Sequence, residues 1–487
     1  MIYHSTRNEQ LTASSTHAVL QGIAPDGGLY ICDPAALRFD WRAALEKDTL
    51  SMAADILHAL LPDFQDMDRL VRDSYAGKFP TSDLTPLTPV ADKYVLELYH
   101  GPTSAFKDVA LSVLPRLIVA AAKAEGMKGD VVILTATSGD TGKAAMEGFH
   151  DVPGTRITVF YPYGGVSAVQ QAQMATQDGA NVRVCAVRGN FDDAQTGVKE
   201  IFAACKDKDL HGAMLSSANS INIGRLVPQV VYYVYAYAKL LANGEIAKDE
   251  KVNVVVPTGN FGNILAAYFA KQMGVPFGKL ICASNDNKVL YDFFQTGTYD
   301  KNREFILTTS PSMDILVSSN LERLLYLSCG RDAAKTKAMM EQLSTNGKYE
   351  ITADMKEFMK DFYAGYADME ENAKEIRKVF DDTGYLIDTH TGVAAAVYEQ
   401  YKAKTGDATK TVIASTASPY KFSRSVMEAV LGKKEDTDEF ALIDEMERIS
   451  GVKIPQAIEE IRDAKILHNR QCKPEEMEET VKQTFSK

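Results

Sequence analysis

A single lysine carries the most specific chemistry in this sequence of 487 residues. Lys107 closes the polar loop HGPTSAFK, and an apolar stretch suited to a helix follows over residues 109–125. The positive end of a helix dipole lowers the pKa of an amine in the first turn, and burial beside Phe106 would lower that pKa further. Because carbonyl addition requires a neutral amine, Lys107 is a candidate Schiff-base lysine. An exposed lysine at a helix start is the alternative that residue type alone favours.

A second loop has the composition of a phosphate cradle. It follows an apolar run and opens a helical stretch, and it reads Gly259-Asn260-Phe261-Gly262-Asn263. Two glycines three residues apart let backbone N–H groups converge on a phosphate at a helix N-terminus. The spacing differs from the GxGxxG dinucleotide fingerprint. Taken in isolation, a plain strand-to-helix turn explains the loop equally well.

A third loop combines hydroxyl groups with glycines in the sequence Thr137-Ser138-Gly139-Asp140-Thr141-Gly142-Lys143. Hydroxyls and glycine backbone amides at a helix start can hold a carboxylate or a phosphate. The loop lacks the GxxxxGK[ST] pattern of a Walker A motif. A helix-capping turn is the simpler alternative.

A fourth loop, residues 415–422, follows a strand that looks buried and contains Thr416. A threonine hydroxyl can bond a ring nitrogen without holding it protonated, as a carboxylate would, although a strand-end hydroxyl is the alternative. Together the four loops offer an amine, two anion cradles and a partner for a ring nitrogen. That set fits pyridoxal phosphate, whose aldehyde, phosphate and pyridine nitrogen need such groups.

Alternating strands and helices must position these loops. From about residue 94 each apolar run ends in a polar loop and is followed by a helical stretch, which predicts an α/β fold with parallel sheets wrapped by helices. Ligands bind at the carboxyl ends of such strands, where the four loops lie. The predicted strands cover residues 95–98, 131–134, 157–161, 182–187, 252–256, 279–284 and 411–415. The predicted helices cover 109–125, 143–149, 166–178, 193–206 and 264–273.

We expect three regions along the chain. An N-terminal domain covers residues 1–95, a catalytic region covers 96–430 with a smaller subdomain at about 130–225, and a helical C-terminal extension covers 431–487. Residues 331–380 are rich in Lys, Glu and Met and are predicted to be helical.

Composition narrows the class of protein. The formal net charge is −12, and an acidic surface repels nucleic-acid phosphates, so we expect no nucleic-acid partner. No apolar run reaches membrane-spanning length, and the N-terminus lacks the apolar segment of a signal peptide. The cysteines are scattered without metal-ligand spacing, so we expect free thiols, no metal and a cytoplasmic location. They are Cys32, Cys185, Cys205, Cys282, Cys329 and Cys472.

Five separated motifs make the chain similar to the threonine synthase family. In chain order they are YHSTRN (3–8), GIAPDGGLY (22–30), HGPTSAFKD (100–108), TATSGDTG (135–142) and PTGNFGN (257–263). The resemblance implies a fold-type II pyridoxal-phosphate enzyme with two parallel-type sheets. Its members convert O-phospho-L-homoserine and water into L-threonine and phosphate (EC 4.2.3.1), the last step of threonine biosynthesis.

The resemblance also implies roles for individual residues. Lys107 would bond the cofactor aldehyde and move protons, and Thr416 would face the pyridine nitrogen. The cofactor phosphate would be held by Gly259, Asn260, Phe261, Gly262 and Asn263. The substrate carboxylate would be bound by Ser138, Gly139 and Thr141.

A further segment, Asn219 to Arg225, is similar to the family's substrate-phosphate site. Arg225 offers a bidentate fork to a phosphate, and Asn219 and Ser220 add neutral donors. An arginine that caps the preceding loop is the structural alternative.

Relatives of this fold often carry Asn near the cofactor's phenolic oxygen where this chain has Asp140, and an ionised Asp there would repel a phenolate. Two positions depart from the family pattern: Ser418 and Tyr420 replace the His and Ala of TAHPAKF. His390 lies in a DTHTG stretch and could touch the cofactor, or it could simply be a packed imidazole at a helix start.

Two other functions remain open from the sequence. One is a related dehydratase or phospholyase that acts on another hydroxy or phospho amino acid, with the same lysine and phosphate loop. The other is a non-catalytic, threonine-synthase-like binding protein, against which the intact Lys107 argues. We expect a small-molecule substrate, O-phospho-L-homoserine, no membrane, and a monomer or homodimer that closes over its substrate.

Overall fold

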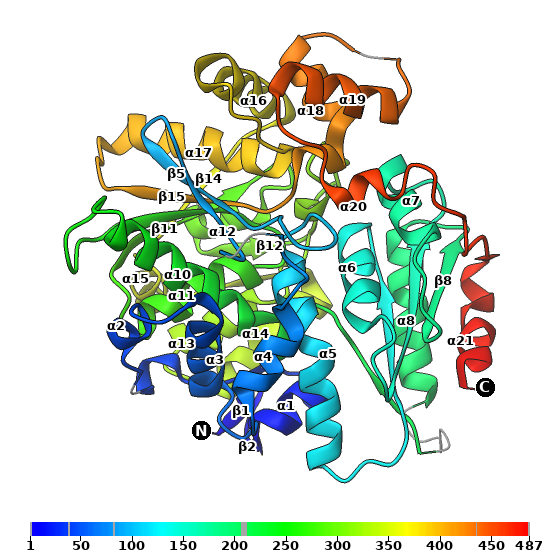
Figure 1. Ribbon diagram of the computed structural model, residues 1–487. Coiled ribbons are helices and arrows are strands. Elements are labelled where there is room, and N and C mark those ends of the chain that lie inside the picture. Colours follow the sequence, from blue (N-terminus) through cyan, green and yellow to red (C-terminus); the bar gives the residue numbers. More distant parts are fainter. Residues whose placement is uncertain (1, 38, 81–82, 206–211, 435, 486–487) are drawn as a thin grey trace.

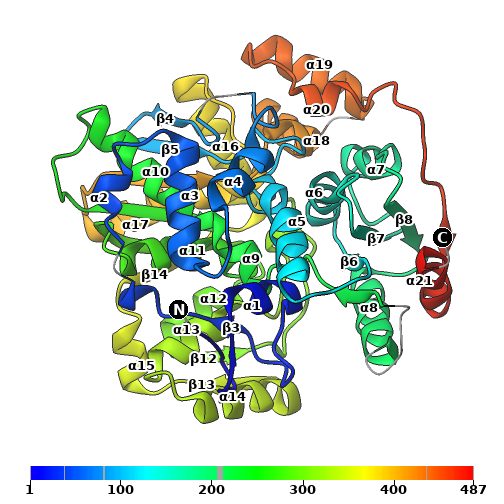
Figure 2. The same ribbon diagram turned by 60° about the horizontal axis from the view of Figure 1, so that its bottom comes forward.

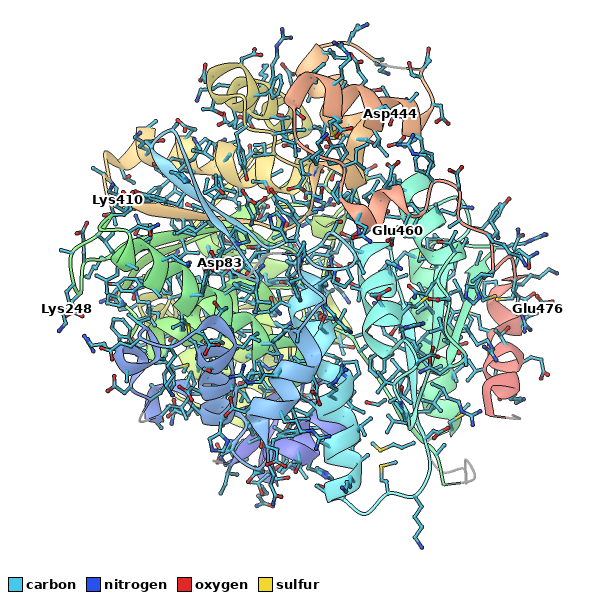
Figure 3. All side chains as sticks on the ribbon, viewed as in Figure 1. Asp83, Lys248, Lys410, Asp444, Glu460 and Glu476 are labelled. Atoms are coloured by element: carbon cyan, nitrogen blue, oxygen red, sulfur yellow. The ribbon has the colours of Figure 1, made fainter. Side chains whose placement is uncertain are left out.

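Two sheets organise the computed structural model, which describes residues 2–37, 39–80, 83–205, 212–434 and 436–485. Within these residues one sheet has six strands in the order β14-β11-β10-β15-β5-β4, and another has five in the order β16-β8-β7-β6-β9. Figure 1 shows them in two lobes, with the smaller lobe and the C-terminus at the right. Charged side chains such as Lys248, Asp444 and Glu476 project outward into solvent (Figure 3).

The six-stranded sheet is parallel except at one edge, where β4 runs antiparallel to β5. The central strands VNVVVP (β10) and TVIAS (β15) are rich in Val and Ile and are buried along their whole length, as parallel sheets covered on both faces require. The strands are β4 (Leu87–Val90), β5 (Lys93–Glu97), β10 (Val252–Pro257), β11 (Phe277–Ser284), β14 (Phe362–Tyr366) and β15 (Thr411–Ser415).

The five-stranded sheet is parallel throughout. Its strands are β6 (Val131–Ala136), β7 (Thr155–Pro162), β8 (Val182–Val187), β9 (Met214–Ser216) and β16 (Gln471–Cys472). Its neighbouring helices are α6 (Asp140–Phe149), α7 (Ala168–Ala175) and α8 (Phe191–Cys205). The prediction of an α/β fold with two parallel-type sheets is therefore confirmed, and each predicted strand is present.

The structure corrects the prediction that residues 331–380 are helical, because the strands β13 (Lys348–Glu350) and β14 lie among the helices. Strand β14 lies between α15 (Ala353–Phe358) and α16 (Met369–Thr383) and pairs with β11. Its sequence, FYAGY, is only five residues long and shows no alternation of apolar and polar residues, so pairing with a distant strand decides its conformation.

The C-terminal extension is helical, as expected, but it also contributes a strand. It contains α19 (Glu439–Ser450), α20 (Gln456–Glu459) and α21 (Met477–Phe485), and β16 adds to the edge of the small sheet. Figure 1 shows this segment running from the top of the large lobe down along β8.

The N-terminal helices cover the large lobe. Figure 2 shows α3 (Thr49–Leu60) beside α10 (Pro228–Ala242), and α4 (Met67–Tyr75) lies against α5 (Lys107–Ala124). Among the described residues, no helix has both the length and the apolar content needed to cross a membrane.

Neighbouring parallel strands bring the predicted loops to one edge of the large sheet. Strand β15 lies between β5 and β10 with all three strands parallel, so their carboxyl ends are adjacent. The chain leaves β5 toward Lys107, leaves β10 toward the 259–263 loop, and leaves β15 toward Thr416. The topology therefore places three of the four predicted loops side by side.

Candidate active site

Lys107 is the first residue of α5, and its side chain is buried, with 8% of its surface exposed. Its Nζ lies 4.8 Å from the centre of the Phe106 ring and 3.4 Å from Ser312 Oγ. Burial lowers the pKa of this amine to about 8. The structure therefore gives Lys107 the dry surroundings and the reduced basicity that a Schiff-base lysine needs.

Hydrogen bonds fix the loop that delivers Lys107. The carboxylate of Asp108 accepts a bond of 2.8 Å from the Thr103 backbone N–H and a second bond from the Thr103 hydroxyl. Ser104 has φ 59°, which is unusual for a residue with a side chain. The close ties around it hold this conformation, so the start of α5 is rigidly placed.

The 259–263 loop is held by neighbours from residues 312–320. A Cβ at position 259 would lie only 2.5 Å from the Ser312 carbonyl oxygen, so the structure has room only for glycine there. The Ser318 hydroxyl donates to the Gly259 carbonyl at 2.7 Å, and the Asn320 side chain donates to the Asn260 carbonyl at 3.0 Å. These bonds hold the first two residues of the loop in place without a ligand.

Asn263 leaves a donor free at the base of this loop. Its side-chain oxygen accepts from the Tyr233 hydroxyl, whereas its Nδ2 is buried and has no hydrogen-bond partner among the described residues. A buried donor without an acceptor costs free energy, so the position suits an anionic ligand. Phe261, with φ 64°, turns the chain into α11 (Gly262–Gln272) and packs against Phe294 and Phe362.

Thr416 is joined directly to the Lys107 loop. Its carbonyl accepts a bond of 2.8 Å from the Phe106 N–H, and the next residues continue the pairing with a bond of 3.0 Å from Ser418 N–H to Ser104 O. The Thr416 side chain is 6% exposed. Tyr420, one of the two departures from the family pattern, is buried and donates its hydroxyl to the Val452 carbonyl in the C-terminal extension.

Asp140 has a partner to which sequence reasoning assigned no role. Lys421 is fully buried, and its Nζ lies 2.8 Å from Asp140 Oδ1. The other oxygen, Oδ2, lies 3.7 Å from Lys107 Nζ. Burial alone would raise the pKa of Asp140, but Lys421 and Lys107 together hold it well below its usual range. Asp140 is therefore ionised, and the repulsion that this charge would cause is offset by a second buried cation.

The loop before α6 is organised by one hydroxyl. Thr137 Oγ1 accepts backbone bonds from Gly139 at 3.0 Å and from Gly142 at 2.9 Å. Gly139 has φ 135°, and a Cβ there would collide with the Gln170 side chain. Ser138 and Thr141 remain partly exposed, so both hydroxyls can reach a ligand.

The segment from Asn219 to Arg225 borders the 259–263 loop. The Asn320 side chain donates to the Ser220 carbonyl at 3.1 Å as well as to the 259–263 loop. Arg225 is 2% exposed, and its Nη1 donates to the Ala218 carbonyl at 2.5 Å, which is the structural contact expected of a capping arginine. Its Nε, however, is buried without a partner among the described residues. Burial lowers the pKa of Arg225 to about 10.

Sequence reasoning missed a chain of contacts behind Lys107. The backbone N–H of Ser312, in the turn η2 (Pro311–Met313), donates to His390 Nε2 at 3.2 Å, and Nδ1 of the same ring lies 2.7 Å from Asp388. His390 is 2% exposed and starts α17 (Thr389–Thr405), so it is a packed imidazole. The DTHTG motif was the available signal, but the turn it orients lies 78 residues away.

The assembled groups fit pyridoxal phosphate. An amine of reduced basicity and an ionised carboxylate lie together at Lys107 and Asp140. The 259–263 loop adds an unpartnered buried donor and a backbone that no side chain at Gly259 obstructs. These features match an aldehyde-bearing ring that also carries a phosphate.

Comparisons with known proteins agree with this geometry. Three protein-family models match the chain: "Threonine synthase N terminus" over residues 2–75, "Pyridoxal-phosphate dependent enzyme" over 83–417 and "Threonine synthase, C-terminal" over 391–468. The crystal structure of pyridoxal-phosphate-bound threonine synthase from Brucella melitensis has a TM-score of 0.88 and 35% identity, and the match covers 100% of both chains.

Two curated relatives show how much of the chain is shared. The threonine synthase of Saccharomyces cerevisiae is 36% identical over 96% of this chain and 97% of its own length. The human protein "Threonine synthase-like 1" is 37% identical over 85% of this chain, which spans only 58% of that longer relative.

Proposed function

We propose that this chain, which belongs to the threonine synthase family of pyridoxal-phosphate-dependent enzymes, converts O-phospho-L-homoserine and water into L-threonine and phosphate. One observation carries the proposal: the amine of Lys107 is buried beside an ionised carboxylate at the sheet edge that also bears the 259–263 loop. An exposed lysine could not perform this chemistry, because water would compete for every group it must contact.

The residues that would hold the cofactor come from three strand ends of the large sheet. Lys107 would bond its aldehyde, Thr416 would face its ring nitrogen, and the 259–263 loop would bind its phosphate. The unpartnered Asn263 Nδ2 supports the last assignment. When bound, the cofactor supplies an electron sink for charge that develops at the substrate's α-carbon.

Lys107 would carry protons once the substrate has displaced it. Because burial lowers its pKa to about 8, a useful fraction of the amine is neutral near neutral pH and can accept the α-proton. Asp140, 3.7 Å away, stabilises the ammonium that results. Lys107 can then return the proton when the product is released.

The substrate would span the two lobes. Ser138, Gly139 and Thr141 would bind its carboxylate at the start of α6, where partly exposed hydroxyls and a helix N-terminus meet. Asn219, Ser220 and Arg225 would bind its phosphate, and the free Arg225 Nε supports this role. Because the two sets belong to different elements, approach of the small lobe would close the site over the substrate.

Product analysis with O-phospho-L-homoserine tests the reaction. We expect the wild-type protein to release phosphate and threonine in equal amounts, and Lys107→Ala to form essentially no threonine, because the amine that accepts and returns the proton is gone. Lys248→Ala, at an exposed lysine on the far rim, is the matched control and should retain full activity.

Two results of this product analysis, and one result of a cofactor-binding test, would contradict the proposal. Equal turnover by wild type and Lys107→Ala would remove Lys107 from the chemistry. Phosphate release with a keto acid and no threonine would indicate a phospholyase. A colourless protein that forms no borohydride-reducible adduct at Lys107 with added pyridoxal phosphate would indicate a binding protein.

We also propose a cytoplasmic location, a monomer or homodimer, and a division into residues 1–95, 96–430 and 431–487. All six cysteines are free thiols, which supports a reducing compartment. Four of the five strands of the small sheet come from residues 131–216, which supports a subdomain at about 130–225.

A further inference from the structure

Lys421 is a buried amine that the proposed reaction does not use. It is 0% exposed and lies in the turn η3 (Pro419–Phe422), which follows β15. Its Nζ donates to the Thr103 carbonyl at 2.9 Å and to Asp140 Oδ1 at 2.8 Å. A buried ammonium is retained only where charged and polar partners offset its loss of hydration, so these contacts define a specific site for this amine.

The two oxygens of Asp140 are divided between two lysines. Oδ1 accepts from Lys421 and also from Gln170 Nε2 at 3.0 Å, whereas Oδ2 faces Lys107 Nζ at 3.7 Å. Bonds from two directions to Oδ1 fix the rotation of the carboxylate. Its second oxygen therefore faces Lys107.

Sharing one carboxylate changes what Asp140 does to Lys107. If Lys107 were its only cationic neighbour, Asp140 would hold the proton of Lys107 tightly. The ammonium of Lys421 offsets part of the negative potential that the Asp140 carboxylate creates at Lys107, so Lys107 loses its proton more easily. The charged groups that act on Lys107 from the surrounding elements are Asp108 in α5, Asp140 in α6, Arg225 in α9 (Ile223–Leu226) and Lys421 in η3.

We propose that Lys421 is a positioning residue that holds Asp140 as a shared carboxylate and thereby keeps the nitrogen of Lys107 ready to lose its proton. This inference rests on the proposed function in one respect, namely that Lys107 bonds the cofactor. It assigns Lys421 no contact with substrate. It also predicts that loss of Lys421 makes the Lys107 nitrogen hold its proton more tightly and that loss of Asp140 makes it hold the proton less tightly. A purely structural ion pair would not produce these opposite effects.

The test is a pH titration of the full-length, cofactor-loaded protein, followed by the visible absorption of the bound cofactor. That absorption changes when the nitrogen joined to Lys107 gains or loses its proton. We expect Lys421→Met to raise the midpoint by about 1 pH unit or more, and Asp140→Asn to lower it by a similar amount. Lys421→Arg, which keeps the charge, should bring the midpoint back toward the wild-type value.

Lys143→Met is the matched control, because Lys143 is a second buried lysine near the site but pairs with Glu147 and Gln177 instead of Asp140. Its midpoint should equal that of the wild type. If Lys421→Met does not fold, Asp140→Asn and the double variant Asp140→Asn/Lys421→Met decide the matter. Because Lys421 acts through Asp140, both variants should have the same low midpoint, and a higher midpoint in the double variant would overturn this role.

If the visible absorption of the bound cofactor does not titrate in an accessible pH range, the amine of Lys107 is measured directly. Competitive acetylation of Lys107 in the full chain after cofactor removal, read by mass spectrometry, should show the same signs. An unchanged midpoint in Lys421→Met, or shifts of equal sign in both single variants, would overturn the role of Lys421. A protein that shows the expected shifts and makes no threonine would overturn the proposed reaction and leave this role standing.

Discussion

The two lobes build their halves of the site in different ways. In the large lobe, the strand-end loops are bonded to one another: Phe106 N–H to Thr416 O at 2.8 Å, and Ser318 and Asn320 to the 259–263 loop. In the small lobe, the loop before α6 is organised from within, by the two backbone bonds to Thr137. The predicted cofactor side is therefore pre-organised as a unit, whereas the backbone of the predicted substrate loop takes its shape from bonds within its own lobe.

Asp140 connects these two halves. It belongs to the small lobe, yet its carboxylate lies against Lys421 and Lys107 of the large lobe. A comparison of variants in each half should therefore separate three effects: loss of the dry lysine site, loss of the cofactor cradle, and loss of the substrate loop.

The largest effect should come from the buried charge in the large lobe. Burial lowers the pKa of Lys107 from 10.5 to about 8, so the unfolded chain binds more protons than the folded chain between these values, and stability rises with pH there. We expect the free energy of unfolding of cofactor-free Lys107→Met to exceed that of the wild type by about 3 kcal/mol at pH 7, and by less than about 1 kcal/mol at pH 10. Urea unfolding at both pH values measures this difference.

Lys248→Met serves as the control for this comparison. Lys248 is exposed, so its variant should differ from wild type by the same small amount at both pH values. A Lys107→Met difference that does not change with pH would show that the Lys107 ammonium is not penalised by burial.

The second-largest effect should come from the 259–263 loop, where Gly259 lies close to Ser312. A Cβ added there would meet the Ser312 carbonyl at 2.5 Å, so Gly259→Ala must push apart the loop and the turn that contacts Lys107. We expect an overpacking cost of about 2–3 kcal/mol, seen as a fall of about 30- to 150-fold in pyridoxal-phosphate affinity by absorbance titration.

Gly262→Ala, in the same loop, is the matched control, since its nearest non-neighbouring atom lies at 3.4 Å. It should bind the cofactor almost as well as wild type. Similar losses for both variants would mean that the close contact with Ser312 does not set the shape of the cradle.

The smallest effect should come from the substrate loop. Thr137→Val keeps the side-chain shape but leaves the N–H groups of Gly139 and Gly142 without their acceptor. We expect a loss of about 1–2 kcal/mol, seen as a KM for the phosphorylated substrate raised by about 5- to 30-fold, with cofactor affinity unchanged. Steady-state kinetics and the same absorbance titration measure both quantities.

Thr135→Val on β6 isolates the effect of the hydroxyl. Thr135 is also fully buried, but its Oγ1 has no hydrogen-bond partner among the described residues. Its replacement should leave KM unchanged and stability equal or slightly higher. An increased KM in both variants would indicate a general loosening of β6 instead of a loss of loop order.

The sequence predicts those parts of the fold and of the site whose signals lie within short stretches of consecutive residues. The strands β6, β10 and β15 are continuous apolar runs, and the loops after them hold glycines and hydroxyls at fixed spacing, so both could be recognised locally. Lys107 could be placed at a helix start for the same reason. Strand β14 could not, because FYAGY becomes a strand only beside β11.

The α/β class, the cofactor type and the position of the reactive amine could thus be predicted from the sequence, because each is signalled by short segments: apolar strand-like runs, the loops that follow them, and a lysine at a helix start. The partners of those groups were settled by packing. Lys421 meets Asp140 across 281 positions because the small lobe packs against the edge of the large sheet, and Ser312 meets His390 across 78 because the turn η2 packs against the start of α17. The burial that lowers the basicity of Lys107, and the two lysines that keep Asp140 ionised, are in place only once that edge has been assembled.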